Sequence, residues 1–359
     1  MKILHTADIH LKEYEDERWK ALQKLIEVGK KERVKIFVIS GDLFNKDINA
    51  KSLRPKIREL FSHNGFQIIL IPGNHDSDSY KSGMYFGEDT TILTDLEDCF
   101  EYKGVRICGI PFEPIGGEEI LYRLHSLLNR FTSDKKKKNI LLYHGELLDA
   151  FFSRKSRKDF GDEGGERYMP VKLSYFKDLN IDYVLAGHFH SNFQVRRLAK
   201  GGYFVYPGSP LSLTKRETGQ RKVNIFKLGD PPREYRLNTS YLEEVNIIFD
   251  PLKDKIPLEI VKKHLASFPP EARVILTIKG YINSKEIKMN ESELVEEIKK
   301  ISSKKCVELP RFEFKDIQVI LEDELFKKLL HKLKQADYDE GKKRQMRDIA
   351  IKAMSEARV

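Results

Sequence analysis

The sequence lacks any apolar run long enough to cross a membrane. Nowhere in the 359 residues do about 18 apolar residues follow one another, so we expect no transmembrane helix. The first ten residues, MKILHTADIH, also lack a signal peptide's apolar stretch of about 7–15 residues, because Asp8 interrupts it. The mean hydropathy is −0.49. These absences predict a cytoplasmic protein.

Cysteine and tryptophan are also scarce. The chain has one Trp and three cysteines, which are an odd number without the spacing of metal ligands. We therefore expect Cys99, Cys108 and Cys306 to be reduced, buried thiols without a function. No internal repeat is present.

The composition that remains is globular and basic. Apolar residues make up 40% and charged residues 33%, and the length suits one large domain or two ordinary ones. Lys and Arg exceed Asp and Glu by 64 − 55 = 9. A basic surface favours polyanions such as nucleic acid, because binding releases their counterions.

The first 240 residues alternate between apolar runs and amphipathic segments. Runs such as KIFVIS at 35–40 and QIILI at 67–71 predict buried strands. Apolar residues at helical spacing predict helices at 16–30, 53–61 and 118–130. The alternation predicts sheets covered by helices, with loops at the strand ends free to carry chemistry. Further strands are expected at 2–7, 105–109, 139–143, 183–186, 203–206, 223–228 and 234–237. The last three should complete a second sheet.

A change of pattern near residue 240 predicts a domain boundary. Beyond it we expect a small α+β unit that holds none of the candidate ligands described below. Its expected elements are strand 244–249, helix 257–267, strand 273–280, helix 291–302 and strand 312–321. The predicted domains are therefore 1–240, 241–322 and 323–359.

Residues 323–359 are charged and helical, with Gly341 between two apolar stripes. The glycine predicts a break, and so a pair of helices. The stripes could both dock on their own domain, or the pair could bind a partner. The stripes consist of Leu325, Phe326, Leu329, Leu330 and Leu333, and of Met346, Ile349, Ile351 and Met354.

Five short polar motifs each follow a predicted strand. Each alone has an ordinary structural explanation, as a turn or as a hydrogen-bonded histidine. Five of them in this context predict a single site, where adjacent glycines allow tight turns and close backbone approach. The motifs are Asp8-Ile9-His10, Gly41-Asp42, Gly73-Asn74-His75-Asp76, His144-Gly145 and Gly187-His188-Phe189-His190.

The candidate ligands combine oxygen donors with imidazoles. Oxygen and nitrogen donors without thiolate suit Mn²⁺, Fe or Zn²⁺ better than Ca²⁺. Seven ligands are too many for one ion with an open position, but they suit two ions that share a carboxylate. Asp42 is the natural bridge, as a lone carboxylate after a central strand. The seven are Asp8, His10, Asp42, Asn74, His144, His188 and His190.

In this order the motifs resemble those of the calcineurin-like metallophosphoesterases, over about residues 1–240. The segments LHTADIHL, GDLFN, IPGNHD, GHFH and YPGSP resemble, within that superfamily, the SbcD/Mre-eleven DNA repair nucleases. The α+β unit that follows is similar to their capping domain. The resemblance implies an α/β fold, a two-sheet sandwich flanked by helices, with a small α+β capping domain and a C-terminal helical tail.

The resemblance also implies roles for single residues. It gives Asp8, His10, Asp42 and His190 to one ion, and Asp42, Asn74, His144 and His188 to the other. His75 would then be the catalytic histidine outside the first coordination shell, and Asp76 would orient it. Many relatives place a second histidine three residues after the bridging aspartate, where this chain has Asn45.

Substrate contacts are predicted from loops near these motifs. Asn45 could hydrogen-bond a phosphate, and Gly208 and Ser209 could offer backbone and hydroxyl donors. The polar segment 152–172 includes Arg154 and Lys155, which could touch phosphates or could simply lie on a solvated loop. The run of four lysines at 135–138 is more typical of a solvated turn.

Three functions fit the sequence. The family resemblance implies a Mn²⁺-dependent DNA nuclease with 3′-to-5′ exonuclease and single-strand endonuclease activity in double-strand-break repair. It also implies a homodimer, and an SMC-like coiled-coil ATPase of the SbcC/Rad-fifty type bound by residues 323–359. In the hypothetical mechanism, hydroxide held by two metals attacks the phosphodiester while His75 protonates the leaving group. The alternatives are a small-molecule phosphodiesterase or protein phosphatase, and a DNA-binding scaffold with a vestigial site.

Overall fold

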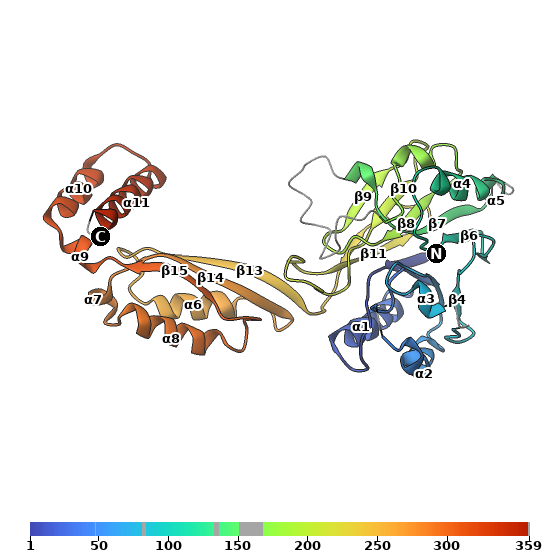
Figure 1. Cartoon of the computed structure of the whole chain (residues 1–359), viewed down its shortest axis with the longest axis horizontal. Helices are drawn as coiled ribbons and strands as arrows, with labels where there is room; N and C mark the ends of the chain where they lie inside the picture. The colour runs from blue at the N-terminus through green and yellow to red at the C-terminus, as the bar shows by residue number, and fades with distance from the viewer. Residues whose placement is uncertain (47, 81–83, 133–135, 151–167, 358–359) are drawn as a thin grey trace. The chain divides into compact units, whose positions relative to one another are not determined.

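The chain folds into two compact units, Met1–Leu242 and Glu243–Val359. The computed structural model describes residues 1–46, 48–80, 84–132, 136–150 and 168–357 (Figure 1). The division lies close to the boundary expected near residue 240. The further division of the second unit at 322/323 stays a prediction.

The first sheet is built around parallel strands that are buried on both faces. Its strand order is β12-β11-β1-β2-β3-β4. Strands β1, β2, β3 and β4 run parallel, whereas β11 and β12 join antiparallel at the β1 side. The strands span Lys2–Thr6 (β1), Ile36–Ser40 (β2), Gln67–Ile71 (β3), Thr90–Ile92 (β4), Lys222–Lys227 (β11) and Glu234–Arg236 (β12).

The second sheet has the order β5-β6-β7-β8-β10-β9. The expectation that 223–228 and 234–237 would complete this sheet is wrong, because β11 pairs along β1 in the first sheet. The expectation for 203–206 is confirmed, since β10 pairs parallel with β8. The strands span Cys99–Tyr102 (β5), Val105–Ile110 (β6), Lys138–His144 (β7), Tyr183–Gly187 (β8), Gln194–Arg197 (β9) and Tyr203–Tyr206 (β10).

Three apolar layers hold the first unit together. The strands alternate their side chains, so Ile3 and Val38 of the first sheet pack with Ile140 and Leu142 of the second between the sheets. Helices α1 and α2 cover the outer face of the first sheet, and α4 and α5 that of the second (Figure 1). This is the predicted two-sheet sandwich flanked by helices. The helices span Glu17–Lys31 (α1), Ala50–Phe61 (α2), Ser77–Tyr80 (α3), Glu118–Ser126 (α4) and Leu128–Thr132 (α5).

Local sequence explains where these helices begin and end. The Asp16 side chain caps α1 by accepting a hydrogen bond from the Trp19 amide at 2.7 Å. The single helix expected at 118–130 is two short helices, which are separated at Leu127. Two short 3-10 helices, η1 (Leu148–Ala150) and η3 (Leu173–Phe176), lie in the connections that follow.

A β-hairpin corrects the prediction for two cysteines. Strands β5 and β6 pair antiparallel and place Cys99 directly opposite Cys108, with a Cα–Cα distance of 4.3 Å, and the two form a disulfide. The turn residues Lys103 and Gly104 both have positive φ, as tight two-residue hairpins require. Only Cys306 is a free, buried thiol as expected.

The second unit is a three-stranded sheet, β13-β14-β15, with α6 and α8 packed on one face (Figure 1). A strand is expected at 312–321, but β15 ends at Asp316 and the helix α9 follows it. The Asp316 carboxylate accepts a hydrogen bond from the Gln318 amide at the start of α9. The elements span Tyr241–Phe249 (β13), Pro257–Ala266 (α6), Ala272–Ile282 (β14), Ser284–Ile287 (α7), Glu291–Ser302 (α8), Arg311–Asp316 (β15) and Gln318–Glu322 (α9).

The helical tail is the expected pair of helices, α10 (Glu324–Gln335) and α11 (Glu340–Glu356). The break does not fall at Gly341, which lies in the first turn of α11. The Asp339 side chain accepts a hydrogen bond from the Lys342 amide at 2.9 Å, so the helix begins before the glycine. Among the described residues, no helix is long and apolar enough to span a membrane.

Candidate metal centre

The five polar motifs meet at one edge of the sandwich. Strands β1, β2 and β3 of the first sheet, and β7 and β8 of the second, each run parallel to their neighbours in this group. Their carboxyl ends carry the predicted motifs, which follow β1, β2 and β3 and begin at the last residues of β7 and β8. The sequence prediction that these loops converge is confirmed by their side-chain distances.

The backbone of these loops is held in an uncommon conformation. Asp8, His10, Asp42 and His188 all have left-handed φ, at 57°, 52°, 52° and 95°. This conformation is costly for a residue with a Cβ atom, and it persists where the surrounding structure enforces it, often at functional sites. The strain turns the side chains toward the strand ends, where they meet.

Two positions beside the ligands must be glycine, because ligand side chains lie where a Cβ atom would be. A Cβ atom at Gly41 would lie 2.0 Å from Nδ1 of His144, and one at Gly73 would lie 2.1 Å from Oδ1 of Asp42. Real Cβ atoms do not come this close, so neither position tolerates a side chain unless the site shifts.

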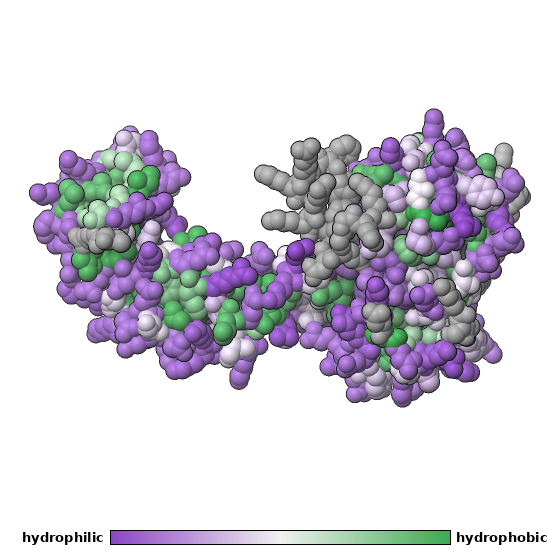
Figure 2. All heavy atoms as spheres, in the orientation of Figure 1, coloured by the Kyte–Doolittle hydropathy of each residue, from purple (hydrophilic) through white to green (hydrophobic). Residues whose placement is uncertain are grey.

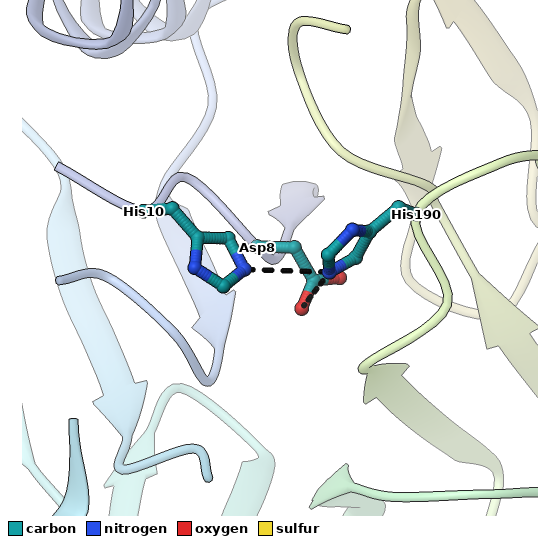
Figure 3. Close-up of side chains that lie close together, drawn as sticks. All are labelled: Asp8, His10 and His190. Carbon is teal, nitrogen blue, oxygen red and sulfur yellow. Dashed lines mark hydrogen bonds and ion pairs between the residues drawn. The ribbon is translucent and has the colours of Figure 1, made fainter. Parts of the chain in front are cut away.

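Asp8, His10 and His190 form one group of potential ligands (Figure 3). The His10 and His190 rings point toward one another, with Nε2 atoms 3.3 Å apart, and Nε2 of His190 lies 3.7 Å from Oδ1 of Asp8. Nitrogen and oxygen lone pairs so close together suit a shared cation.

Asn74, His144 and His188 form a second group. The amide oxygen of Asn74 lies 2.8 Å from Nε2 of His144 and 3.3 Å from Nδ1 of His188. The loops after β3 and β8 supply Asn74 and His188, and the last residue of β7 is His144, so the group exists only when both sheets are in place.

Asp42 lies between the two groups. Its Oδ2 atom is 3.5 Å from Nε2 of His10 and 3.3 Å from Nε2 of His144. This oxygen is fully buried and makes no hydrogen bond of good geometry with any residue that the structure describes. Burying a carboxylate oxygen without such a bond costs free energy, and one cation on each side of Asp42 would satisfy this oxygen. The residues present therefore fit two divalent ions.

Burial and charge shift the protonation equilibria here in opposite directions. Burial lowers the pKa of His10 to about 3 and raises the pKa of Asp8 to about 6. Burial alone would raise the pKa of Asp42, but the neighbouring His144 outweighs it and holds that pKa well below its usual range. His144 is correspondingly raised to a pKa of about 10 by Asp42 despite its own burial.

Hydrogen bonds orient two of the imidazoles. Nδ1 of His144 lies 2.8 Å from the carbonyl oxygen of Ser40, and Nδ1 of His190 lies 3.4 Å from Oε1 of Glu217. Acceptors at Nδ1 direct Nε2 of both rings into the site, where a bound ion would replace the Nε2 proton of His144. Glu217 is not among the predicted site residues, and its signal in the sequence is a spacing of three residues from Thr214, to which it bonds.

The first 192 residues, more than half of the chain, match the calcineurin-like phosphoesterase family, and they contain all seven candidate ligands. The chain belongs to the calcineurin-like phosphoesterase family. Together with the ligand groups at the strand ends, this makes the protein a metal-dependent phosphoesterase.

The phosphoesterase is also similar to a nuclease subunit and to a DNA double-strand break repair protein, which confirms the resemblance expected from its motifs. The SbcD component of the nuclease SbcCD of Staphylococcus saprophyticus is 27% identical over 288 residues, 73% of this chain and 72% of that protein. DNA double-strand break repair protein Mre11 of Saccharolobus solfataricus is 24% identical over 274 residues, 70% of this chain and 65% of that protein. A solved dimetal phosphatase from Danio rerio aligns at 12% identity with a TM-score of 0.43, over 63% and 91% of the two chains.

His75 forms a further group of potential ligands with His10 and Asp42, and Asp76 follows it in the same loop. The His75 ring packs edge-on against His10 with centroids 4.7 Å apart, and its backbone amide donates to Oδ1 of Asp42 at 2.9 Å. The Asp76 carboxylate accepts hydrogen bonds from the amides of Gly73 and Phe44. Burial raises the pKa of Asp76 to about 7. These bonds hold the loop that carries His75, whereas an orienting bond to its ring stays a prediction.

Asn45 takes the place of the second histidine of many relatives, and it is already engaged with its neighbours. Its amide oxygen accepts a hydrogen bond from Arg18 at 3.3 Å, and its amide nitrogen donates to the Lys46 carbonyl. Arg18 also donates to the His10 carbonyl at 2.5 Å, so it ties Asn45 to the His10 loop. A phosphate contact by Asn45 stays a prediction.

The structure corrects the prediction for Ser209. Its side chain is fully buried, its hydroxyl group bonds to Leu211 and Glu217, and its amide donates to the His190 carbonyl. Ser209 therefore supports the His190 loop and presents no free donor to a phosphate. Gly208 adopts a φ of 78° in the same turn, and its predicted phosphate contact is untested.

The basic segments are only partly covered by the structure. Arg154 and Lys155, with most of segment 152–172, lie outside the described residues. Of the lysine run, Lys137 pairs with Glu101 at 2.6 Å and Lys138 with Asp182 at 2.7 Å. These surface ion pairs agree with a solvated turn.

Proposed function

We propose that this phosphoesterase is a Mn²⁺-dependent DNA nuclease that acts in double-strand-break repair. The observation that carries phosphodiester hydrolysis is the buried Oδ2 of Asp42, which lies between His10 and His144 without a good hydrogen bond. DNA as the substrate is supported by the similarity to the SbcD and Mre11 proteins and by the net charge of +9.

In this proposal, Asp8, His10, Asp42 and His190 hold one ion, and Asp42, Asn74, His144 and His188 hold the other. When bound, two divalent ions would supply an activated water and positive charge for the phosphate oxygens. The mixed nitrogen and oxygen donors suit Mn²⁺, and Fe or Zn²⁺ share these preferences.

His75 is proposed to protonate the departing sugar oxygen. Its ring lies against His10 and beside Asp42, so it faces the ligand groups from the side of the β3 loop. An imidazole with an ordinary pKa near 6.5 is suited to donate a proton at neutral pH. Asp76 would act at a distance, by fixing the loop through the amides of Gly73 and Phe44.

The expected activities are 3′-to-5′ exonuclease and single-strand endonuclease, in a homodimer with an SMC-like coiled-coil ATPase. The tail helices α10 and α11 are proposed to bind the ATPase. Leu325 and Ile349 support this, because their side chains are 70% and 68% exposed, and Figure 2 shows apolar residues on the surface of this hairpin. Large exposed apolar side chains mark interaction sites when they gather on one face.

The test is digestion of end-labelled linear and circular single-stranded DNA with Mn²⁺, beside a chromogenic bis-phosphodiester. We expect both DNA forms to be degraded, and Asp42→Asn to abolish this degradation. His125→Ala is the matched control, since this exposed histidine on α4 lies outside the site. Size measurement of the intact protein, alone and with the ATPase, tests the assembly.

Hydrolysis of the small ester without any degradation of DNA would contradict the nuclease proposal. That result would favour a small-molecule phosphodiesterase or protein phosphatase instead. Full DNA cleavage by Asp42→Asn would contradict the two-ion chemistry itself.

A further inference from the structure

Glu217 is a buried carboxylate at the back of the ligand groups. It lies between β10 and β11, and its side chain is only 1% exposed. Its Oε2 atom accepts hydrogen bonds from the Leu213 amide at 2.8 Å and from the Ser209 hydroxyl at 3.1 Å. Its Oε1 atom accepts one from the Thr214 hydroxyl at 3.1 Å. A buried charge is tolerated only when it is satisfied in this way.

The same Oε1 atom reaches the His190 ring. It lies 3.4 Å from Nδ1 of His190, while Nε2 of that ring lies 3.3 Å from Nε2 of His10 and 3.7 Å from Oδ1 of Asp8. The carboxylate and the proposed ion thus lie on opposite sides of one imidazole. A carboxylate in this position keeps the proton on Nδ1 and makes Nε2 a stronger donor.

Arg221 fixes the backbone that carries His190. Its guanidinium, 3% exposed, donates to the carbonyl oxygens of His190, Ser191 and Ser209. These three bonds do not involve Glu217, although Arg221 also donates to the Ser209 hydroxyl, which in turn donates to Glu217. Loss of the Glu217 charge should change the properties of the ring without releasing the loop.

The two ion positions differ in the acceptor at Nδ1 of a histidine ligand. His144, which belongs to the other position, has the neutral carbonyl of Ser40 as its Nδ1 acceptor, at 2.8 Å. Among the described residues, the ring of His190 thus has a charged Nδ1 acceptor, Glu217, where the ring of His144 has a neutral one. The attraction between a carboxylate and a cation is stronger in a buried site than in water.

We propose that Glu217 is a positioning residue that holds His190 in the Nδ1-protonated form and so strengthens metal binding at the Asp8–His10–His190 position. This inference deepens the proposed function and rests on its two ion positions. Among the described residues, the side-chain hydrogen bond that Glu217 makes outside its own loop goes to the His190 ring.

The test is calorimetric titration of the metal-free full chain with Mn²⁺, for the unmutated protein and for Glu217→Gln. We expect the unmutated protein to bind two ions, and Glu217→Gln to weaken one of them by roughly 10–100-fold while the other changes little. Ser212→Ala is the matched control, because its hydroxyl donates to the backbone carbonyl of Glu217 and leaves the carboxylate untouched.

Three outcomes would overturn the inference. They are equal affinities in Glu217→Gln and the unmutated protein, an equal loss at both positions, and a similar loss in Ser212→Ala. If the unmutated protein does not bind two ions, the proposed function itself fails, so the two failures are distinguishable.

A second measurement reads the position of the proton in the unmutated protein and needs a variant only to assign the signal. Long-range ¹H–¹⁵N NMR of the metal-free protein reports which nitrogen of each histidine ring carries the proton, and His190→Gln identifies the signal. We expect a proton on Nδ1 of His190 and none on Nε2. A proton on Nε2 alone would contradict the role of Glu217.

Discussion

At the strand ends of the first unit, polar side chains are buried. In the helical hairpin of the second unit, apolar side chains are exposed. In the loops, Asp8, Asp42 and His144 are 0% exposed although all three are polar. In the hairpin, Leu325 and Ile349 are 70% and 68% exposed although both are apolar. Each arrangement is unfavourable for an isolated chain, for opposite reasons.

The difference separates two kinds of function. Buried polar groups on a left-handed backbone are stabilised when a cation binds among them, so the first region is built for chemistry. Exposed apolar side chains are stabilised when another surface covers them, so the second region is built for association. No group of potential metal ligands occurs in the described residues of the second unit.

The largest effect expected in this comparison comes from His75→Ala. The substitution should lower DNA cleavage by about 10²–10⁴-fold, because it removes a proton donor and no proposed ligand. Binding of two Mn²⁺ ions should persist, as measured by calorimetry. Unchanged cleavage would remove His75 from the mechanism, and loss of an ion would make it a ligand.

Loss of the disulfide should have the next largest effect. Replacement of Cys99 and Cys108 by alanine opens a loop with a sequence separation of 9. The free energy of unfolding of the first unit should fall by about 2–3 kcal/mol, because the unfolded chain regains the freedom of that loop. Urea unfolding with and without reductant measures this. Cys306→Ala is the control, and an equal response to reductant in the double variant would contradict the assignment.

Acid should weaken the first unit through His5, which is fully buried on β1. Burial lowers the pKa of His5 to about 3, below the 6.5 of an unfolded histidine. Below pH 6.5 the unfolded chain therefore binds a proton that the folded chain does not, and stability is lost as the pH falls. From pH 7 to pH 5 the unmutated protein should lose about 2 kcal/mol more than His5→Gln.

The pH dependence of urea unfolding in the metal-free protein checks this. Both histidines of the second unit, His264 and His331, are exposed, so the second unit should not lose stability in this way as the pH falls. Parallel pH profiles for His5→Gln and the unmutated protein would contradict the assignment.

The smallest effect is expected at the hairpin. Leu325→Lys should change the free energy of unfolding by no more than about 0.5 kcal/mol, as is usual for an exposed position. The adjacent Phe326 is fully buried, and Phe326→Ala should cost about 3–5 kcal/mol. Thermal unfolding separates the two. If Leu325→Lys were as destabilising as Phe326→Ala, the exposed stripe would be part of the fold and not a surface for a partner.

The sequence predicts the central strands and the converging loops well. Expected and observed bounds agree for β3 and β10, because a proline, Pro72 or Pro207, directly follows each apolar run. The carboxyl ends of parallel strands meet at one edge, so the ligand motifs could be grouped without the structure. These inferences depend only on the local sequence pattern and on the rule that parallel strands end at the same edge of a sheet.

What the sequence could not predict depends on pairing between distant segments. Strand β11 pairs with β1 across more than 200 residues, and nothing in its own pattern assigns it to the first sheet. The disulfide depends on the register of one hairpin, which sets Cys99 opposite Cys108. Glu217 and Ser209 acquire their contacts with His190 only when the loop after β10 folds beneath that ring.

The most direct test of the central claim is anomalous diffraction from crystals of the protein soaked in Mn²⁺. We expect two manganese peaks, one beside Asp8, His10 and His190 and one beside Asn74, His144 and His188, with Asp42 between them. A single peak with no room for a second ion, or peaks away from Asp42, would contradict the two-ion site.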